Sequence, residues 1–290
     1  MSDAVVVAGS GRSTLGEGVT WSARSNAVLW VDILGKAIRR LSLADGSVTR
    51  WDTPERTGWL IERASGDGFV AGLQSGFHDL TLPEGGGMAE VRRIVDPEPA
   101  LPDNRMNDAA ADPAGRIWAG TMPVSCEGAS GALYRLDPDC TLTRVDAPYT
   151  ISNGPAISPD GRWLFHTDTA LDTIFRFDIR GDGTLGSRAP HIVFDGSVGH
   201  PDGMTLDADG CLWVAHWGGA RVTRYDPEGK AMRHIPLPAS QITRMAFAGT
   251  DLDRMFVSSA ADGRDDEEHA GALFEVDPGC RGLPTLAFGA

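Results

Sequence analysis

One stretch of the sequence decides the fold. Residues 202–229 read DGMTLDADGCLWVAHWGGARVTRYDPEG. An apolar segment, Cys211-Leu-Trp-Val-Ala215, follows a turn rich in Asp and Gly, and Arg221-Val-Thr-Arg-Tyr-Asp226 then alternates apolar with polar residues. Alternation with a period of two is typical of a half-buried β-strand, and the next residue, a proline, ends the strand because it has no N–H to donate. The stretch therefore predicts short strands joined by tight turns.

The same unit recurs along the chain. Each copy has an apolar strand with one aromatic residue, and the aromatics lie about 45 residues apart. They are Trp30, Phe69, Trp118, Phe165, Trp213 and Phe256. About 45 residues is the length of a four-stranded propeller blade, and no segment shows a long helical pattern. The sequence predicts an all-β protein, with residues 1–290 forming a single six-bladed β-propeller domain.

A propeller has to close its ring, because otherwise its first and last blades expose unpaired edges. The apolar segment Val5-Val-Val7 is the predicted closing strand. We expect it to complete the last blade beside the C-terminal segment Leu283–Phe288.

Five polar residues precede strand aromatics by about a dozen positions. They are Glu17, Asn107, Asn153, Asp202 and Arg244. In a propeller the first strand of each blade lines the central channel, so residues far apart in sequence meet at one mouth of it. A glycine directly follows three of them, which lets the backbone approach closely or adopt a positive φ.

Glu17, Asn153 and Asp202 offer only oxygen ligands. Such ligands favour Ca²⁺, Mg²⁺ or Mn²⁺ and, less selectively, Zn²⁺. Three protein ligands leave positions open for water or substrate, which is what catalysis by a metal ion requires. Turn chemistry explains Asn-Gly and Asp-Gly dipeptides equally well, so spacing alone leaves both interpretations open.

Composition excludes several classes of protein. The chain has 290 residues and a net charge of −14, whereas nucleic-acid binding needs a basic surface. No run of 18 apolar residues predicts a membrane span, and the first residues do not resemble a signal peptide. The four cysteines form no C-x-x-C pair, so a thiolate zinc site is not expected. We expect a cytoplasmic protein, with a monomer favoured.

The motifs around these polar residues resemble those of the SMP-30/gluconolactonase/regucalcin-like family. They occur in family order across essentially the whole chain, and the resemblance is strongest to bacterial sugar-acid lactonases. The motifs are Leu15-Gly-Glu-Gly18, Arg105-Met-Asn-Asp108, Ala119-Gly-Thr-Met122, Ser152-Asn-Gly154, Pro201-Asp-Gly203 and Leu212-Trp-Val-Ala215.

The resemblance implies a six-bladed propeller that binds one divalent cation (Ca, Zn, Mn, Mg or Fe(II)) in the channel mouth. Glu17, Asn153 and Asp202 would be its ligands, and Arg105 and Asn107 would hold substrate hydroxyls. The family pattern thus moves Asn107 from the metal towards the substrate. Many relatives have an acidic residue soon after the Gly-Thr-Met motif, but this chain has Pro123-Val-Ser125 there and Glu127 further on.

The implied reaction is hydrolysis of an aldonolactone of glucono-, xylono- or arabinonolactone type to the aldonic acid, in sugar catabolism. Asp202 is the expected general base for the attacking water, since a ligand carboxylate can keep one oxygen free. A small sugar lactone is the expected partner. The alternatives are a phosphotriesterase or arylesterase propeller and a non-catalytic calcium-binding propeller.

Other residues near the predicted channel have two interpretations each. His166 and His216 either touch substrate or, more commonly for a histidine beside a strand, pack within a blade. Trp217 either stacks on sugar or packs at a blade edge. The run Asp265–His269 is more typical of a solvated loop than of a metal cluster.

Overall fold

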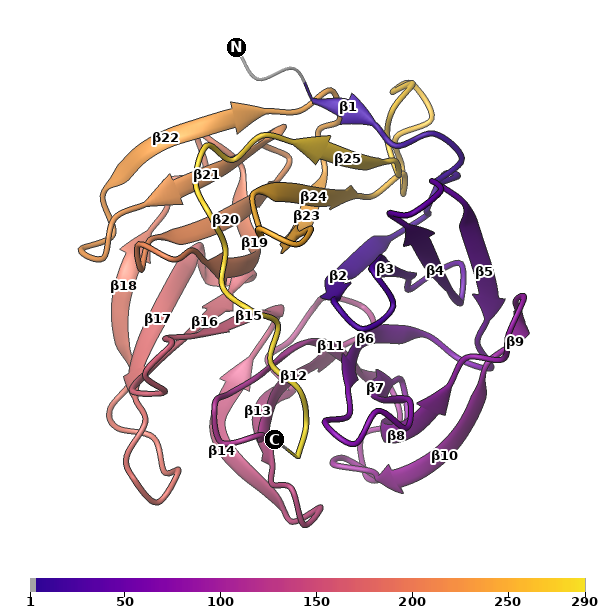
Figure 1. The fold of residues 1–290 in the computed structure, drawn as a ribbon. Helices are drawn as coiled ribbons and strands as arrows, with labels where there is room; N and C mark the ends of the chain where they lie inside the picture. The colour runs from indigo at the N-terminus through magenta and orange to yellow at the C-terminus, as the bar shows by residue number, and fades with distance from the viewer. Residues whose placement is uncertain (1–3, 290) are drawn as a thin grey trace.

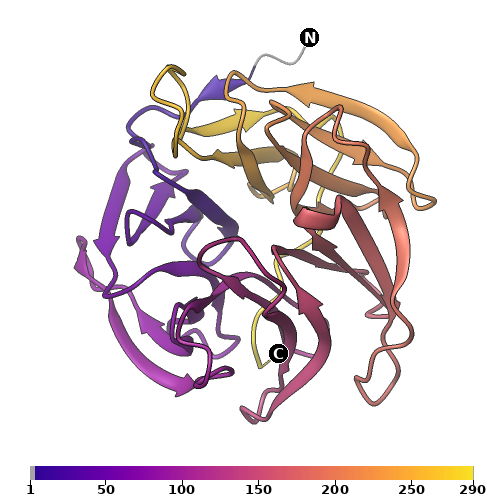
Figure 2. The same cartoon turned by 180° about the vertical axis from the view of Figure 1, so that it is seen from behind.

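Six β-sheets surround a central channel in the computed structural model, which describes residues 4–289 (Figures 1 and 2). The innermost strands of blades 1 to 6 contact one another around the ring. They are β2 (Gly16–Ser22), β6 (Thr57–Glu62), β11 (Asn104–Ala111), β15 (Ser152–Ile157), β19 (His200–Leu206) and β23 (Ile242–Ala248). The predicted six-bladed propeller is confirmed.

The second strand of each blade carries the aromatic residue that marked the repeat. These strands are β3 (Ala27–Asp32), β7 (Phe69–Leu73), β12 (Ile117–Pro123), β16 (Trp163–Asp168), β20 (Leu212–Trp217) and β24 (Arg254–Ser259). All of the aromatics except Phe69 are buried. Burial on both faces of these strands explains why they are continuous apolar runs, whereas the outer strands alternate.

The third strands are β4 (Ala37–Ser42), β8 (Gly76–Thr81), β13 (Gly131–Leu136), β17 (Thr173–Asp178), β21 (Arg221–Tyr225) and β25 (Leu273–Val276). The outermost strands are β5 (Val48–Asp52), β10 (Glu90–Val95), β14 (Leu142–Tyr149), β18 (Ala189–Val193), β22 (Ala231–Pro236) and β1 (Val5–Val6). A short strand, β9 (Gly87–Met88), pairs in parallel with β5, and one 3₁₀ turn, η1 (Thr169–Leu171), follows β16. Within residues 4–289 no helix has the length and apolar character to cross a membrane.

Ring closure differs from the prediction in one respect. Val5 and Val6 do form the closing strand, and they pair with Glu275 and Phe274 of β25. The segment expected beside them, Leu283–Phe288, instead leaves blade 6 and crosses the face of the ring that is turned towards the viewer in Figure 1, as the yellow trace shows. The place beside β1 is taken by β25 (Leu273–Val276), which ends before this segment begins.

This C-terminal strap, residues 282–289, ties blade 6 to blades 2 and 3. Phe288 donates its N–H to the carbonyl of Glu62 (2.8 Å) and accepts from Ala64 (2.9 Å). Its ring is buried at 3% exposure and packs in a core cluster with Trp59 and Met106. The strap covers one end of a cavity of about 310 Å³ in the channel, and the cavity extends to Gly18, Asp108 and Arg244 near the predicted ligands.

Every innermost strand is irregular at the same level of the channel. Its ladder to the second strand skips one or two residues, between Glu17 and Thr20 in β2 and at corresponding places in the other five. A bulge bends the strand and re-aims its side chains. The bulges therefore turn the starts of six strands towards one mouth of the channel.

The contribution of the strap to stability can be tested by substitutions that leave the channel mouth unchanged. Phe288→Ala should lower the free energy of unfolding by about 3 kcal/mol, because it empties a packed site in the core. Leu286→Ala is the matched control, since Leu286 is 37% exposed, and it should cost under about 1 kcal/mol. Urea denaturation measures both. Equal losses in the two variants would contradict the anchoring role of Phe288.

Candidate functional site

Glu17, Asn107, Asn153 and Asp202 come together at the mouth where their strands begin. Each is at least 94% buried, and each lies at or next to the bulge of its strand. Trp59 and Leu60 of the second blade are buried and line the channel cavity that the strap covers. At the level of the ring, blade 2 has Gly58, where a Cβ would lie 2.4 Å from the Asn107 carbonyl oxygen.

Two aspartates fix the chain just before two of these residues. Asp32 accepts from the backbone N–H groups of Thr14 and Leu15 (both 3.0 Å), two residues ahead of Glu17. Asp168 accepts from Thr150 and Ile151 in the same way (both 3.1 Å), two residues ahead of Asn153. Both aspartates are buried, and they end the second strands of blades 1 and 4.

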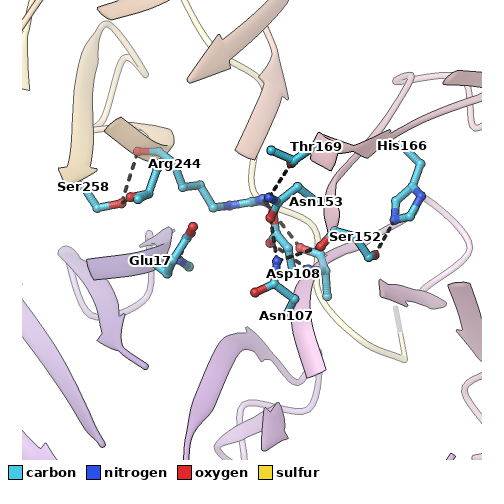
Figure 3. Close-up of polar contacts among 12 residues, drawn as sticks. Glu17, Asn107, Asp108, Ser152, Asn153, His166, Thr169, Arg244 and Ser258 are labelled. Atoms are coloured by element: carbon cyan, nitrogen blue, oxygen red, sulfur yellow. Dashed lines mark hydrogen bonds and ion pairs between the residues drawn. The ribbon is translucent and has the colours of Figure 1, made fainter. Parts of the chain in front are cut away.

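A chain of hydrogen bonds orients the amides. Arg105 donates to Oδ1 of Asn107, and Nδ2 of Asn107 donates to Oδ1 of Asn153 (2.6 Å). Nδ2 of Asn153 donates to Thr169 Oγ1 (2.9 Å), which donates to the carbonyl of Pro201 (2.7 Å). Because its amide nitrogen is held by Thr169, the oxygen of Asn153 points towards Asn107 (Figure 3). The relay also joins blades 3, 4 and 5 directly behind Asp202.

The protein does little to neutralise the negative charges of the Glu17 and Asp202 carboxylates. Burial raises the pKa of Glu17 to about 8, with the nearby Asp108 adding to the effect. Burial, followed by the charges of Glu17 and Asp108, raises the pKa of Asp202 well above its ordinary value. Oδ1 of Asp202 is buried without a hydrogen-bond partner within residues 4–289. Desolvated carboxylates of this kind are costly unless a cation compensates them.

The donor set fits a hard divalent cation. Glu17 and Asp202 supply carboxylate oxygens, Asn153 supplies an amide oxygen, and the free oxygen of Asp202 faces no protein donor. Carboxylate and amide oxygens are the ligands that Ca²⁺, Mg²⁺ and Mn²⁺ prefer.

Arg105 is buried at 7% exposure, and within the described part of the chain it has no ion-pair partner. Its Nη1 also donates to the carbonyl of Met106 (3.2 Å). A cavity of about 370 Å³ lies beside it, between blades 2 and 3, and is lined by Gln74, Asn104 and Thr121 among others. A guanidinium with spare donors beside a polar cavity is suited to oxygen-rich ligands.

Sequence reasoning missed one partner at this mouth. Arg244 had no assigned role, and it pairs with Asp108 of β11, on the opposite side of the ring. The two residues directly follow Thr243 and Asn107, at the position where blades 1, 4 and 5 carry Gly18, Gly154 and Gly203. Charged residues in place of glycine at these two positions could have marked Asp108 and Arg244 as unusual. The spacing of residues in the sequence does not show which side chains form ion pairs across the channel.

The two candidate histidines lie inside their blades. His166 is fully buried, contacts Ser152 Oγ at 3.0 Å and lies edge-on to Tyr149, and burial lowers its pKa to about 3. His216 is also fully buried against Phe194, with a pKa lowered to about 4 by burial. Both are neutral packing residues.

The loop after the Gly-Thr-Met motif and the last candidates also have defined places. Ser125 and Glu127 lie in an exposed turn, where Glu127 N–H donates to Ser125 Oγ (3.2 Å). Trp217 is half-buried at the end of β20. Residues 265–269 include exposed positions in a turn region, as predicted, and residues 4–289 contain no group of three His, Cys, Asp or Glu side chains placed to hold an ion.

The chain is similar to known proteins over nearly its whole length. Residues 15–261 match the family described as SMP-30/Gluconolactonase/LRE-like region. The chain is 36% identical to a 6-deoxy-6-sulfogluconolactonase of Pseudomonas putida, covering 92% of this chain and 94% of the relative. It is also 36% identical to an L-arabinolactonase of Azospirillum brasilense, with 96% and 93% covered.

A solved structure is similar over nearly the whole length. It is that of a calcium-binding protein, regucalcin, from Agrobacterium tumefaciens. Its TM-score is 0.91 at 28% identity, and the match covers 99% of this chain and 97% of that chain.

The raised pKa of Glu17 predicts how stability depends on pH without metal. Between its ordinary value of 4.5 and about 8, the unfolded chain loses this proton while the native protein keeps it, so native stability falls as pH rises. In a chelator, the Tm should fall from pH 5 to pH 8, and Glu17→Gln should flatten that fall. Exposed Glu84→Gln is the control and should keep the wild-type slope. Equal slopes for wild type and Glu17→Gln would contradict a buried, protonated Glu17.

Proposed function

Since the chain belongs to the SMP-30/gluconolactonase/LRE-like family, we propose that it is an enzyme that hydrolyses a sugar lactone to the open-chain aldonic acid. The observation that carries the proposal is the buried, unpartnered carboxylate of Asp202 at a mouth that also holds Glu17, Asn153 and Arg105. The names of the relatives, a sulfogluconolactonase and an arabinolactonase, support the substrate class. Residues 1–290 act as one domain in this proposal.

One divalent cation is part of the proposal, and Glu17, Asn153 and Asp202 would hold it. Such an ion polarises a lactone carbonyl and stabilises the negative charge that develops on its oxygen. The calcium-binding regucalcin among the similar structures supports a divalent ion. Adding Ca, Zn, Mn, Mg or Fe(II) separately to the chelated enzyme identifies the ion that supports activity.

Asp202 has the position and the chemistry of a general base. One of its two carboxylate oxygens would bind the ion, for which the unpartnered Oδ1 is available, and the other can accept a proton from water that attacks the lactone carbonyl. The proton then passes to the ring oxygen as the acyl–oxygen bond breaks, which leaves a hydroxyl and a carboxylic acid, and the acid ionises to the carboxylate by releasing its proton to solvent.

Arg105 and Asn107 form the substrate arm. Asn107 already donates to Asn153 and to the carbonyl of Ser152 (2.7 Å), so it contributes mainly by fixing Arg105 and Asn153. Arg105 keeps donors for sugar hydroxyls at the edge of the polar cavity. Ser125 and Glu127 are exposed, so neither replaces the acidic sugar contact of many relatives without movement of their turn.

A calcium-binding propeller without catalysis is the second candidate, because the similar regucalcin structure is described as a calcium-binding protein. The two functions differ in one measurable respect, since a binding protein takes up the ion but leaves the rate of lactone hydrolysis at its uncatalysed value. A phosphotriesterase or arylesterase would be recognised by turnover of paraoxon or phenyl acetate in place of lactones. A cytoplasmic location and a monomeric state stay predictions from the sequence.

The proposal predicts a metal-dependent lactonase. Chelated enzyme should be inactive on glucono-, xylono-, arabino- and galactonolactone, and a divalent ion should restore activity on at least one of them. Acid release in a pH-stat measures the rate, after the uncatalysed hydrolysis is subtracted. Full activity after exhaustive chelation would contradict the metal site, and no activity with any of the five metals would favour the binding protein.

Asp202→Asn tests the general base. It should lower kcat by about 10²-fold or more, because proton transfer by a positioned side chain typically contributes that much. Circular dichroism should show an unchanged fold, and exposed Asp195→Asn should have wild-type kcat. Wild-type turnover by Asp202→Asn with metal present would remove Asp202 from the mechanism.

A further inference from the structure

Arg244 spans the channel between opposite blades. It rises from the bulge of β23 in blade 6 and pairs with Asp108 of β11 in blade 3, as Figure 3 shows. The side chains are 11% and 3% exposed. The carbonyl of Ala109 lies 3.4 Å from Nη2 of Arg244. Within residues 4–289, Arg244 is the one arginine that forms an ion pair with any of the three carboxylates Glu17, Asp108 and Asp202.

Gly203 leaves the room that the stem of Arg244 occupies. A Cβ on Gly203 would lie 2.9 Å from Cβ and Cγ of Arg244, so the arginine stem packs on the residue directly after Asp202. Asp108 accepts from Ala109 N–H (2.7 Å) and interacts with the backbone N–H of Gly154, directly after Asn153. The ion pair therefore lies directly behind two of the proposed metal ligands.

Asp108 is close enough to act on the metal site. Its charge is the largest electrostatic contribution to the raised pKa of Glu17, and it also acts on Asp202. The mouth thus holds three carboxylates, and the third has Arg244 as its counter-ion. A carboxylate released from that pair would be a further oxygen ligand for a hard cation.

We propose that Arg244 is a positioning residue that holds Asp108 away from the ion, so that Glu17, Asn153 and Asp202 are its only protein ligands and coordination positions remain open for substrate and water. This inference rests on the metal site of the proposed function. In this proposal blade 6 supplies no ligand, and its Arg244 keeps coordination positions of the ion open.

Arg244→Met keeps the aliphatic stem and removes the charge. We expect the variant to bind Ca²⁺ and Mn²⁺ at least about tenfold more tightly, because a freed Asp108 adds a negative ligand. We expect kcat to fall at least about tenfold, because an open position is filled. The metal-free Tm should fall, since Asp108 is left buried and unpaired, and the rise of Tm on adding metal should exceed that of wild type. Isothermal titration calorimetry and thermal unfolding measure these effects.

Two further variants isolate the cause. Asp108→Asn with Arg244→Met replaces the pair by neutral groups, and its metal affinity and kcat should return to within about threefold of wild type. Arg224→Met is the matched control for loss of a buried ion pair. Arg224 and Asp207 are 13% and 0% exposed in blade 5, and this variant should lose stability while keeping wild-type metal affinity.

The outcomes separate this inference from the function on which it rests. If the wild-type protein takes up no divalent ion, the proposed metal site itself is wrong. If the wild type binds one ion but Arg244→Met binds it equally or more weakly, Arg244 has only a structural role and the inference is overturned. A double variant that stays inactive at wild-type affinity would also overturn it, because the pair would then act on substrate directly. Should Arg244→Met fail to fold, the double variant still gives this second test.

Discussion

The channel exists because six innermost strands start at one mouth and the ring around them is closed. Closure depends on a short pairing, Val5 and Val6 against β25, which makes the last blade from both ends of the chain. Each innermost strand is then bulged at one level, so that residues more than 180 positions apart, such as Glu17 and Asp202, face the same volume. The chain topology brings these residues to one mouth of the channel, and the bulges direct their side chains into it.

The mouth holds more negative charge than the protein neutralises. Burial alone would drive Glu17 and Asp202 to bind protons, and their mutual repulsion with Asp108 acts in the same direction. A divalent cation relieves both effects at once, because it replaces lost hydration and separates the carboxylates electrostatically. The clamps by Asp32 and Asp168 hold the chain ahead of Glu17 and Asn153, and the relay through Asn107 uses one lone pair of Asn153 Oδ1, which leaves the second lone pair of that oxygen for an ion.

Much of this could be predicted from the sequence, because it is periodic. The spacing of the aromatics and turns predicted the six blades. The polar residues ahead of Trp30, Phe165 and Trp213 predicted that Glu17, Asn153 and Asp202 meet at one mouth of the channel. The Arg244–Asp108 pair could not be predicted, since spacing does not record which side chains meet across a channel. The strap was misplaced because its anchor, Phe288, packs in a core shared by blades 2 and 3, which lie far from it in sequence. The histidines were ambiguous because alternation along a strand does not distinguish a channel from the interior of a sheet.

The most direct test of the account is the location of the ion itself. Crystals soaked in Mn²⁺ and measured at the manganese absorption edge should give one anomalous peak in the channel. This peak should lie among the side-chain oxygens of Glu17, Asn153 and Asp202, each at about 2.0–2.6 Å from it, with Asp108 still paired to Arg244. A peak elsewhere, or an ion held by Asp108 in the wild-type protein, would contradict it.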